Sequence, residues 1–235
     1  YSVTDKADGY RALLYFNTTG RPYIIDSNMN IEKLGDFEIG ELRNIVIDGE
    51  FVKETKDGKP FNRYLCFDIY FRNIELEMVE KSNLEKRLLG LPIHTDPQDP
   101  DVKSMLSPHI THNTGFTWRH PLHSDSTNRY SILNEVVQIM VSNGIKNVDA
   151  KTFYFPNQDS PMAIFIMSGL CYNDERPYKI DGLIYTPMDL RVGEKYLSPD
   201  NKDDYYLDDN SLTGSWTNVF KWKPPIENSI DFFVQ

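Results

Sequence analysis

The order of the secondary-structure signals constrains the fold of this chain more than any other feature. Alternating apolar patterns with turns between them predict strands early in the chain, at 11–16, 23–26, 45–48 and 64–70. Helical spacing follows over residues 75–144. Strand patterns then return at 153–155, 182–185 and 219–222. Strands, then helices, then strands again without βαβ alternation predict an α+β fold in which antiparallel sheets are flanked by helices.

Three local signals add detail to this prediction. Asp57-Gly58 stands between strand formers and predicts a tight hairpin, because this dipeptide tolerates positive φ. Apolar residues over 133–140 recur at helical spacing, with cap candidates at 126–128 and a stop at Gly144. The acidic stretch 200–209 is expected to be a solvated loop.

Charge and composition exclude several classes of protein. The 235 residues include 25 basic and 35 acidic side chains, and the net charge of −10 argues against a general polyanion binder. The longest apolar stretch, 162–171, is about half of the ~20 residues that a membrane crossing needs. Cys66 and Cys171 cannot form a disulfide framework and are expected to be reduced core residues. We therefore expect an intracellular, cytoplasmic protein that makes no membrane contact.

Five short polar motifs follow one another along the chain. They are KADGYR at 6–11, DGE at 48–50, FDIY at 67–70, KIDGLIY at 179–185 and FKWKP at 220–224. Each motif alone is common, since a lysine before Asp-Gly is usually an exposed turn and a lone phenylalanine is usually core packing. A glycine-rich phosphate loop of the Walker or Rossmann type is missing from the sequence, so side chains would have to hold any nucleotide. The ordered co-occurrence of all five motifs predicts a nucleotide site.

These motifs resemble the KxDG, DGE, aromatic-D, (D/E)G and KxK motifs of the covalent nucleotidyltransferase superfamily, which has an ATP-grasp-like catalytic domain. The superfamily includes mRNA capping guanylyltransferases and ATP-dependent polynucleotide ligases. DGLIYTP and KWKPPIENSIDF resemble the capping enzymes, whereas ligases usually have Glu before that glycine and lack the Trp-Lys-Pro. VDAKTFYFP resembles a further capping-enzyme signature. The likeness is greatest to the multifunctional capping enzymes of large cytoplasmic DNA viruses.

The resemblance implies a two-step mRNA guanylyltransferase reaction at Lys6. A lysine attacks the α-phosphate of GTP, pyrophosphate leaves, and GMP then passes from the lysine to the 5′-diphosphate end of RNA. A lysine attacks only as the neutral amine, and its ordinary pKa is about 10.4. Nearby cations that disfavour the ammonium form are therefore expected around the nucleophile.

The remaining site residues take their roles from the same match. Asp181 and Glu50 are the expected ligands of Mg²⁺ or Mn²⁺, and Glu50 is alternatively an acceptor for a ribose hydroxyl. Phe67 matches the aromatic residue that stacks on the base. Lys179 matches the donor to guanine O6, which favours GTP over ATP because adenine carries its own amino donor at that edge. The basic residues expected at the nucleotide phosphates are Arg11, Lys221 and Lys223.

The resemblance also implies that the chain is a piece of a longer enzyme. Residues 1–225 would form the nucleotidyltransferase catalytic domain, and 226–235 would begin a truncated C-terminal OB-fold domain. Triphosphatase and methyltransferase domains are expected on the same polypeptide, in a viral factory or virion if the source is a virus. Two alternatives stay open: an ATP-dependent DNA or RNA ligase adenylation domain, and a non-catalytic nucleotide-binding module.

Overall fold

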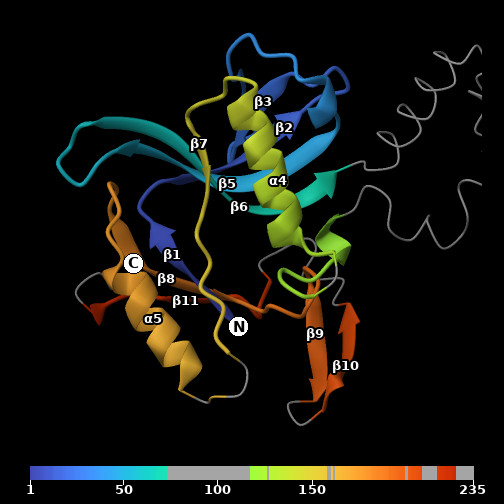
Figure 1. Cartoon of the computed structure of the whole chain (residues 1–235), viewed down its shortest axis with the longest axis vertical. Coiled ribbons are helices and arrows are strands. Elements are labelled where there is room, and N and C mark those ends of the chain that lie inside the picture. Colours follow the sequence, from blue (N-terminus) through green and yellow to red (C-terminus); the bar gives the residue numbers. More distant parts are fainter. Residues whose placement is uncertain are drawn as a thin grey trace, which may run out of the picture.

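The computed structural model describes residues 1–72, 117–125, 127–157, 160, 162–198, 201–207 and 216–225. Within these residues the fold is α+β, as the sequence predicts, with helices packed on sheets that are mostly antiparallel (Figure 1). The sequence-based expectations for 75–116 and for the tail 226–235 lie outside the described residues.

The larger sheet has six strands and carries the first three motifs. Its strands in spatial order are β4 (Ile31–Lys33), β3 (Pro22–Asp26), β2 (Tyr10–Phe16), β5 (Ile45–Glu54), β6 (Pro60–Arg72) and β7 (Val148–Ala150). All neighbours pair antiparallel except β6 and β7, which are parallel. The predicted hairpin joins β5 to β6, and Gly58 takes φ 73° in its turn.

Helix α4 (Arg129–Ser142) lies across one face of this sheet (Figure 1). It begins where the sequence predicts, because the side chain of Asn128 accepts a hydrogen bond from the Ser131 N–H and so caps the first turn. It ends before Gly144, which takes φ 92°. Its apolar stripe is buried against the strands in the main hydrophobic core. Periodicity and cap signals were therefore sufficient to locate this helix.

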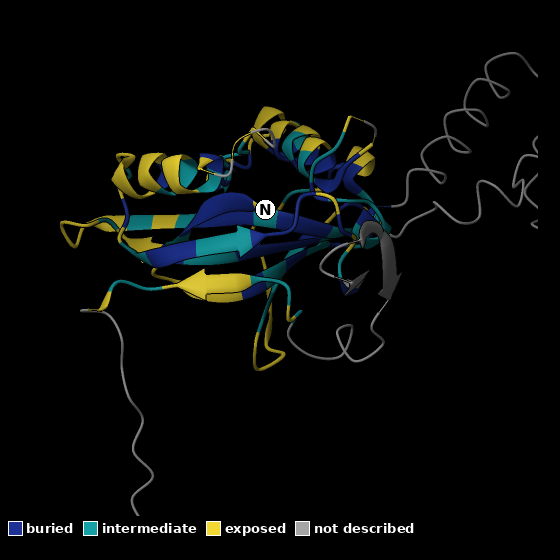
Figure 2. Cartoon of the chain, turned by 90° about the horizontal axis from the view of Figure 1, so that it is seen from below, coloured by how far each residue is buried: buried dark blue, intermediate teal, exposed yellow. Residues whose placement is uncertain are grey.

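The smaller sheet has three strands and joins the two ends of the described chain. Its strands are β1 (Ser2–Ala7), β8 (Ile180–Thr186) and β11 (Phe220–Trp222), with β8 in the centre and both pairings antiparallel. Helix α5 (Ala163–Asn173) packs on β1 and β8. One side of this helix is exposed (Figure 2). Its exposed apolar residues include Phe165 and Ile166.

One strand prediction and one loop prediction were wrong. Only one isolated bridge, between Tyr154 and Val3, forms in the stretch 153–155, which otherwise crosses between the two sheets without a partner strand. The acidic stretch 200–209 is not a loop throughout, because β10 (Asn201–Leu207) pairs with β9 (Glu194–Ser198). A hairpin of this kind satisfies its backbone hydrogen-bonding groups by pairing, so an acidic sequence alone does not exclude a strand.

Other expectations from composition can be checked in the described part of the chain. Cys66 and Cys171 are both buried and free, as predicted. Neither of the described α-helices combines the length and the apolar character that a membrane crossing requires.

Candidate active site

The smaller sheet brings the first, fourth and fifth motifs together at one carboxylate. Lys6 on β1 donates to both oxygens of Asp181 on β8, at 2.7 Å to Oδ1 and 2.8 Å to Oδ2. The Lys223 ammonium, just beyond β11, lies 2.9 Å from Asp181 Oδ2. Partial burial acts to raise the pKa of Asp181, but the hydrogen bonds from the two lysines lower it overall. Lys6 and Lys223 thus both pair with the partly exposed carboxylate of Asp181.

Gly182 makes this convergence possible. It pairs with Lys6 across the sheet and takes φ 148°, a conformation that residues with a side chain rarely adopt. A Cβ atom at this position would lie 1.9 Å from the carbonyl oxygen of Trp222. The glycine of the fourth motif therefore allows β11 to approach β8 and carries Lys223 to the site.

The first and second motifs meet on the larger sheet. Arg11 on β2 binds Asp48 on β5 through two hydrogen bonds, Nε to Oδ1 at 3.0 Å and Nη2 to Oδ2 at 2.6 Å. Tyr70 on β6 donates its hydroxyl to the same Oδ2 at 2.7 Å. The Asp48 side chain is fully buried, whereas 67% of the Arg11 side chain is exposed. The buried Asp48 carboxylate therefore orients the Arg11 guanidinium, while most of the Arg11 side chain stays accessible to a ligand.

Glu50 on β5 of the larger sheet interacts electrostatically with Lys6 on β1 of the smaller sheet. The backbone N–H of Gly9 donates to its carboxylate. Burial raises the pKa of Glu50, while the positive charges of Lys151 and Lys6 act to lower it. The second motif is thus close enough to the predicted nucleophile for the two charges to interact.

Lys151 is a site residue that the sequence analysis did not single out. Its side chain is fully buried, and its Nζ lies 6.0 Å from the centre of the Phe67 ring. It also exerts the largest electrostatic influence on Glu50. The only sequence signal was its place in the VDAKTFYFP segment, which resembles a signature but says nothing of a buried cation.

Two predicted site residues lie at the surface. Lys179 precedes β8 and is exposed, and its carbonyl oxygen accepts the backbone N–H of Asp8 at 2.9 Å. Lys221 is exposed on β11, one residue before Trp222 and opposite Ile184. The structure places both on the smaller sheet or at its edge, and it does not place their ammonium groups in the cluster around Asp181.

The predicted carboxylates fit a divalent metal that is shared with a substrate. Among the residues that the structure describes, no group of three or more His, Cys, Asp or Glu gathers as a ready-made cage. Mg²⁺ does not need one, since it usually takes one or two carboxylates and completes its shell with water and substrate phosphates. Asp181 is 19% exposed and, together with Glu50, supplies hard oxygen donors beside Lys6.

Comparison with known proteins identifies the family of the chain. Residues 1–120 match the family described as mRNA capping enzyme, catalytic domain. Over the full chain, identity is 28% to a probable mRNA-capping enzyme of Acanthamoeba polyphaga mimivirus and 24% to the mRNA-capping enzyme of African swine fever virus strain Badajoz 1971. An mRNA-capping enzyme of Danio rerio is 23% identical over 99% of the chain.

These relatives are all much longer proteins. The chain spans 19% of the mimivirus protein, 18% of the African swine fever virus protein and 30% of the Danio rerio protein. It therefore corresponds to a single portion of each.

Proposed function

Because the chain belongs to the family of mRNA capping enzyme catalytic domains, we propose that it is the guanylyltransferase portion of such an enzyme. In this proposal Lys6 accepts GMP from GTP and passes it to the 5′-diphosphate end of RNA. One observation carries the assignment. The first, fourth and fifth motifs, which lie far apart in the sequence, meet where Lys6 and Lys223 bind the Asp181 carboxylate.

The first step replaces one bond to phosphorus by another. The neutral Lys6 amine attacks the α-phosphorus of GTP, a P–N bond forms, and the bond from the α-phosphorus to the bridging oxygen breaks. Pyrophosphate leaves with the electron pair, and the nitrogen loses a proton to solvent. In the second step an oxygen of the RNA 5′-diphosphate attacks the same phosphorus, the P–N bond breaks, and the lysine regains a proton. GMP is then joined to the RNA.

The surrounding charges support this chemistry before any ligand binds. Lys223 and the exposed guanidinium of Arg11 supply positive charge for phosphate oxygens, and Lys221 is proposed for the same task. Asp181 and Glu50 would hold Mg²⁺ or Mn²⁺ together with the nucleotide phosphates. The bound ion supplies charge neutralisation for the departing pyrophosphate. A cation near Asp181 would also weaken the hold of that carboxylate on the Lys6 ammonium, which favours the neutral amine.

The base is expected to stack on the Phe67 ring. Two lysines are candidates for the donor to guanine O6: Lys179, from its position in the fourth motif, and Lys151, from its position near Phe67. Among the described residues the Lys151 ammonium donates one hydrogen bond, to the Asp5 carbonyl, so further N–H groups are available to a base. Substituting each lysine in turn distinguishes the two.

The finer points of the fold and of the parent protein are part of the same proposal. We place the ATP-grasp-like catalytic domain over residues 1–225 and the start of an OB-fold domain at 226–235. The greater length of the relatives supports further capping domains, a triphosphatase and a methyltransferase, on one polypeptide.

Covalent labelling tests the proposed function directly. The chain is incubated with GTP or ATP labelled at the α-phosphate, in Mg²⁺ or Mn²⁺, and the acid-stable adduct is located by peptide mass spectrometry. We expect label from GTP on Lys6, none in Lys6→Ala, and release of the label when RNA with a 5′-diphosphate end is added. Lys56→Ala, at an exposed lysine of the hairpin, is the control and should label normally.

The other outcomes identify the alternatives. Preferential label from ATP would indicate a ligase adenylation domain. GTP binding without any adduct, with or without the rest of the polypeptide, would indicate a binding module that does not catalyse the transfer.

A further inference from the structure

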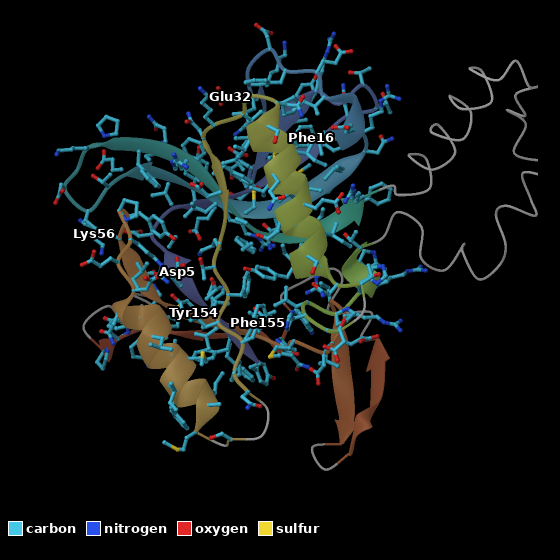
Figure 3. All side chains as sticks on the ribbon, viewed as in Figure 1. Asp5, Phe16, Glu32, Lys56, Tyr154 and Phe155 are labelled. Carbon is cyan, nitrogen blue, oxygen red and sulfur yellow. The ribbon has the colours of Figure 1, made fainter. Side chains whose placement is uncertain are left out.

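Asp5, the residue before the predicted nucleophile, lies at the centre of a buried charge cluster. It sits on β1 beside α5 (Figure 3), and 1% of its surface is exposed. Its strand neighbours Val3 and Ala7 belong to hydrophobic clusters. Alternation along the strand therefore places Asp5 with the apolar residues and Lys6 on the other side. A carboxylate in such surroundings needs partners of opposite charge.

Two cations provide that partnership. The Lys151 ammonium lies 3.1 Å from Asp5 Oδ2, and Arg176 Nε lies 3.2 Å from Oδ1. The Tyr178 hydroxyl lies 3.4 Å from Oδ1. Lys151 also donates a hydrogen bond to the Asp5 main-chain carbonyl at 2.6 Å. Asp5 thus contacts the Lys151 ammonium through both its backbone and its side chain.

The two cations depend on Asp5 to different degrees. Arg176 has other anchors, since it donates to the carbonyl oxygens of Cys171 at 2.8 Å and Asp174 at 3.1 Å. Among the described residues, the Lys151 ammonium has no hydrogen-bond acceptor other than Asp5. Loss of the Asp5 charge would therefore leave Arg176 in place, whereas the Lys151 ammonium would keep only its hydrogen bond to the Asp5 main-chain carbonyl and could move away from the Phe67 ring.

We propose that Asp5 is a positioning residue for base recognition: it holds the Lys151 ammonium beside the Phe67 ring. The preference for a purine with an oxygen at position 6 then depends on Asp5, although Asp5 itself touches no substrate. This inference rests on the proposed function, because it assumes a base stacked on Phe67. In this proposal β1 carries both functions on adjacent residues. Lys6 on one side of the strand is the nucleophile, and Asp5 on the other side acts in nucleotide selection through Lys151.

Equilibrium binding of two nucleotides tests the inference. One is GTP, and the other is the triphosphate of 2-aminopurine riboside, which has the amino group of guanine but no oxygen at position 6. The second is fluorescent, so it is titrated directly and GTP is measured by displacement. We expect Asp5→Asn to lower the GTP preference by about tenfold to a hundredfold, the range for a lost hydrogen bond to a charged group. Binding of the 2-aminopurine nucleotide should change little, whereas a merely structural defect would weaken both.

Two further variants separate positioning from general damage. Asp174→Asn is the matched control, because Asp174 also contacts Arg176, at 3.4 Å, and is not a described partner of Lys151. It should keep the wild-type preference. Lys151→Met should lose the preference as Asp5→Asn does, and the double variant should lose no more than either single one. If Asp5→Asn does not fold, as judged by circular dichroism, Asp5→Glu retains the charge, displaces it by one methylene group, and should lower the preference in the same direction.

Each result supports or overturns a stated idea. An unchanged GTP preference in folded Asp5→Asn or Asp5→Glu, with wild-type protein that labels Lys6 from GTP, overturns the positioning role and leaves the proposed function standing. A wild-type protein that binds neither nucleotide overturns both.

Discussion

Asp48 and Asp68 lie opposite each other where β5 pairs with β6, and each binds an arginine in a different environment. Asp48 holds Arg11, whose side chain is 67% exposed. Asp68 holds Arg129, whose side chain is fully buried, through Nε at 2.7 Å and Nη2 at 3.3 Å. The first pair presents a cation at the candidate site, and the second fixes the start of α4 to the sheet.

Neutralising Asp68 should therefore affect mainly stability, and neutralising Asp48 should affect mainly ligand binding. Asp68→Asn leaves Arg129 charged and buried, so we expect a loss of about 3–5 kcal/mol in the free energy of unfolding. In Asp48→Asn the exposed Arg11 can be hydrated. Burial already raises the pKa of Asp48, so its neutral form is tolerated, and we expect a loss of about 1 kcal/mol. Urea unfolding followed by tryptophan fluorescence measures both.

GTP binding completes this comparison. Asp48→Asn should weaken binding several-fold because Arg11 loses the partner that orients it, and Arg11→Ala should have a similar effect. Equal destabilisation by the two asparagine variants, or GTP affinity unchanged in Asp48→Asn, would contradict the assignment.

Gly182→Ala should disconnect Lys223 from Asp181. The added methyl group meets the Trp222 carbonyl and the backbone is at φ 148°, so β11 must move. We expect a loss of about 1–3 kcal/mol of stability, typical of overpacking, and a loss of Lys6 labelling comparable to that in Lys223→Ala. Gly169→Ala in α5 is the control, because a Cβ there has nothing within 4 Å and alanine favours a helix. Normal labelling by folded Gly182→Ala would show that the β11 contact is dispensable.

The pKa of Glu50 should respond to Lys151. Burial raises this pKa, and Lys151 is the strongest of the charges that act against the increase. Lys151→Met should therefore raise it further, as measured by NMR titration of labelled glutamate carboxyl groups. The protonated form of Glu50 contributes stability that is present below its ordinary pKa and is lost as pH rises through the raised value. Lys179→Met, at an exposed lysine, should leave the titration unchanged, and an equal shift in both variants would contradict the geometry.

Asp181 should show the opposite pH dependence. Despite partial burial, the hydrogen bonds from Lys6 and Lys223 lower its pKa, so its contribution to stability is present above the ordinary value and is lost as pH falls through the lowered one. Lys223→Met should raise the pKa of Asp181 and move acid unfolding to higher pH. Lys221→Met removes an equivalent charge from the neighbouring exposed position, so its acid unfolding should match that of the wild type. Identical shifts in the two variants would indicate a general charge effect.

Local patterns were enough to predict α4 and four strands of the larger sheet, β2, β3, β5 and β6, because their apolar residues recur at helical or strand spacing. The short strands β4 and β7 of that sheet were not predicted. Helix α5 was not predicted, since its residues are apolar on both faces and show no helical period. The outer face of the helix is exposed, including Phe165 and Ile166. Strand β10 was missed for the opposite reason, because its charged residues look like a loop until β9 pairs with it.

The motif residues could be predicted as a set, but their environments could not. The resemblance carried by the motifs implies that Lys6, Asp181 and Lys223 belong to one site, and in the structure both lysines lie within hydrogen-bonding distance of Asp181. Lys151 and Asp5 follow no motif. Their roles arise from burial and from a contact between residues that are 146 positions apart. The sequence alone does not show such a contact.

The small sheet also sets the order in which the cluster around Asp181 can assemble. Within this chain Lys6 is synthesised before Asp181 and Lys223, and most of the described residues lie between them. The strands β2 to β6 are consecutive and can pair soon after synthesis, whereas β1 must wait for β8 and β11. A nascent chain therefore carries Lys6 without its Asp181 partner until β8 has been synthesised, and the cluster is complete only after Lys223.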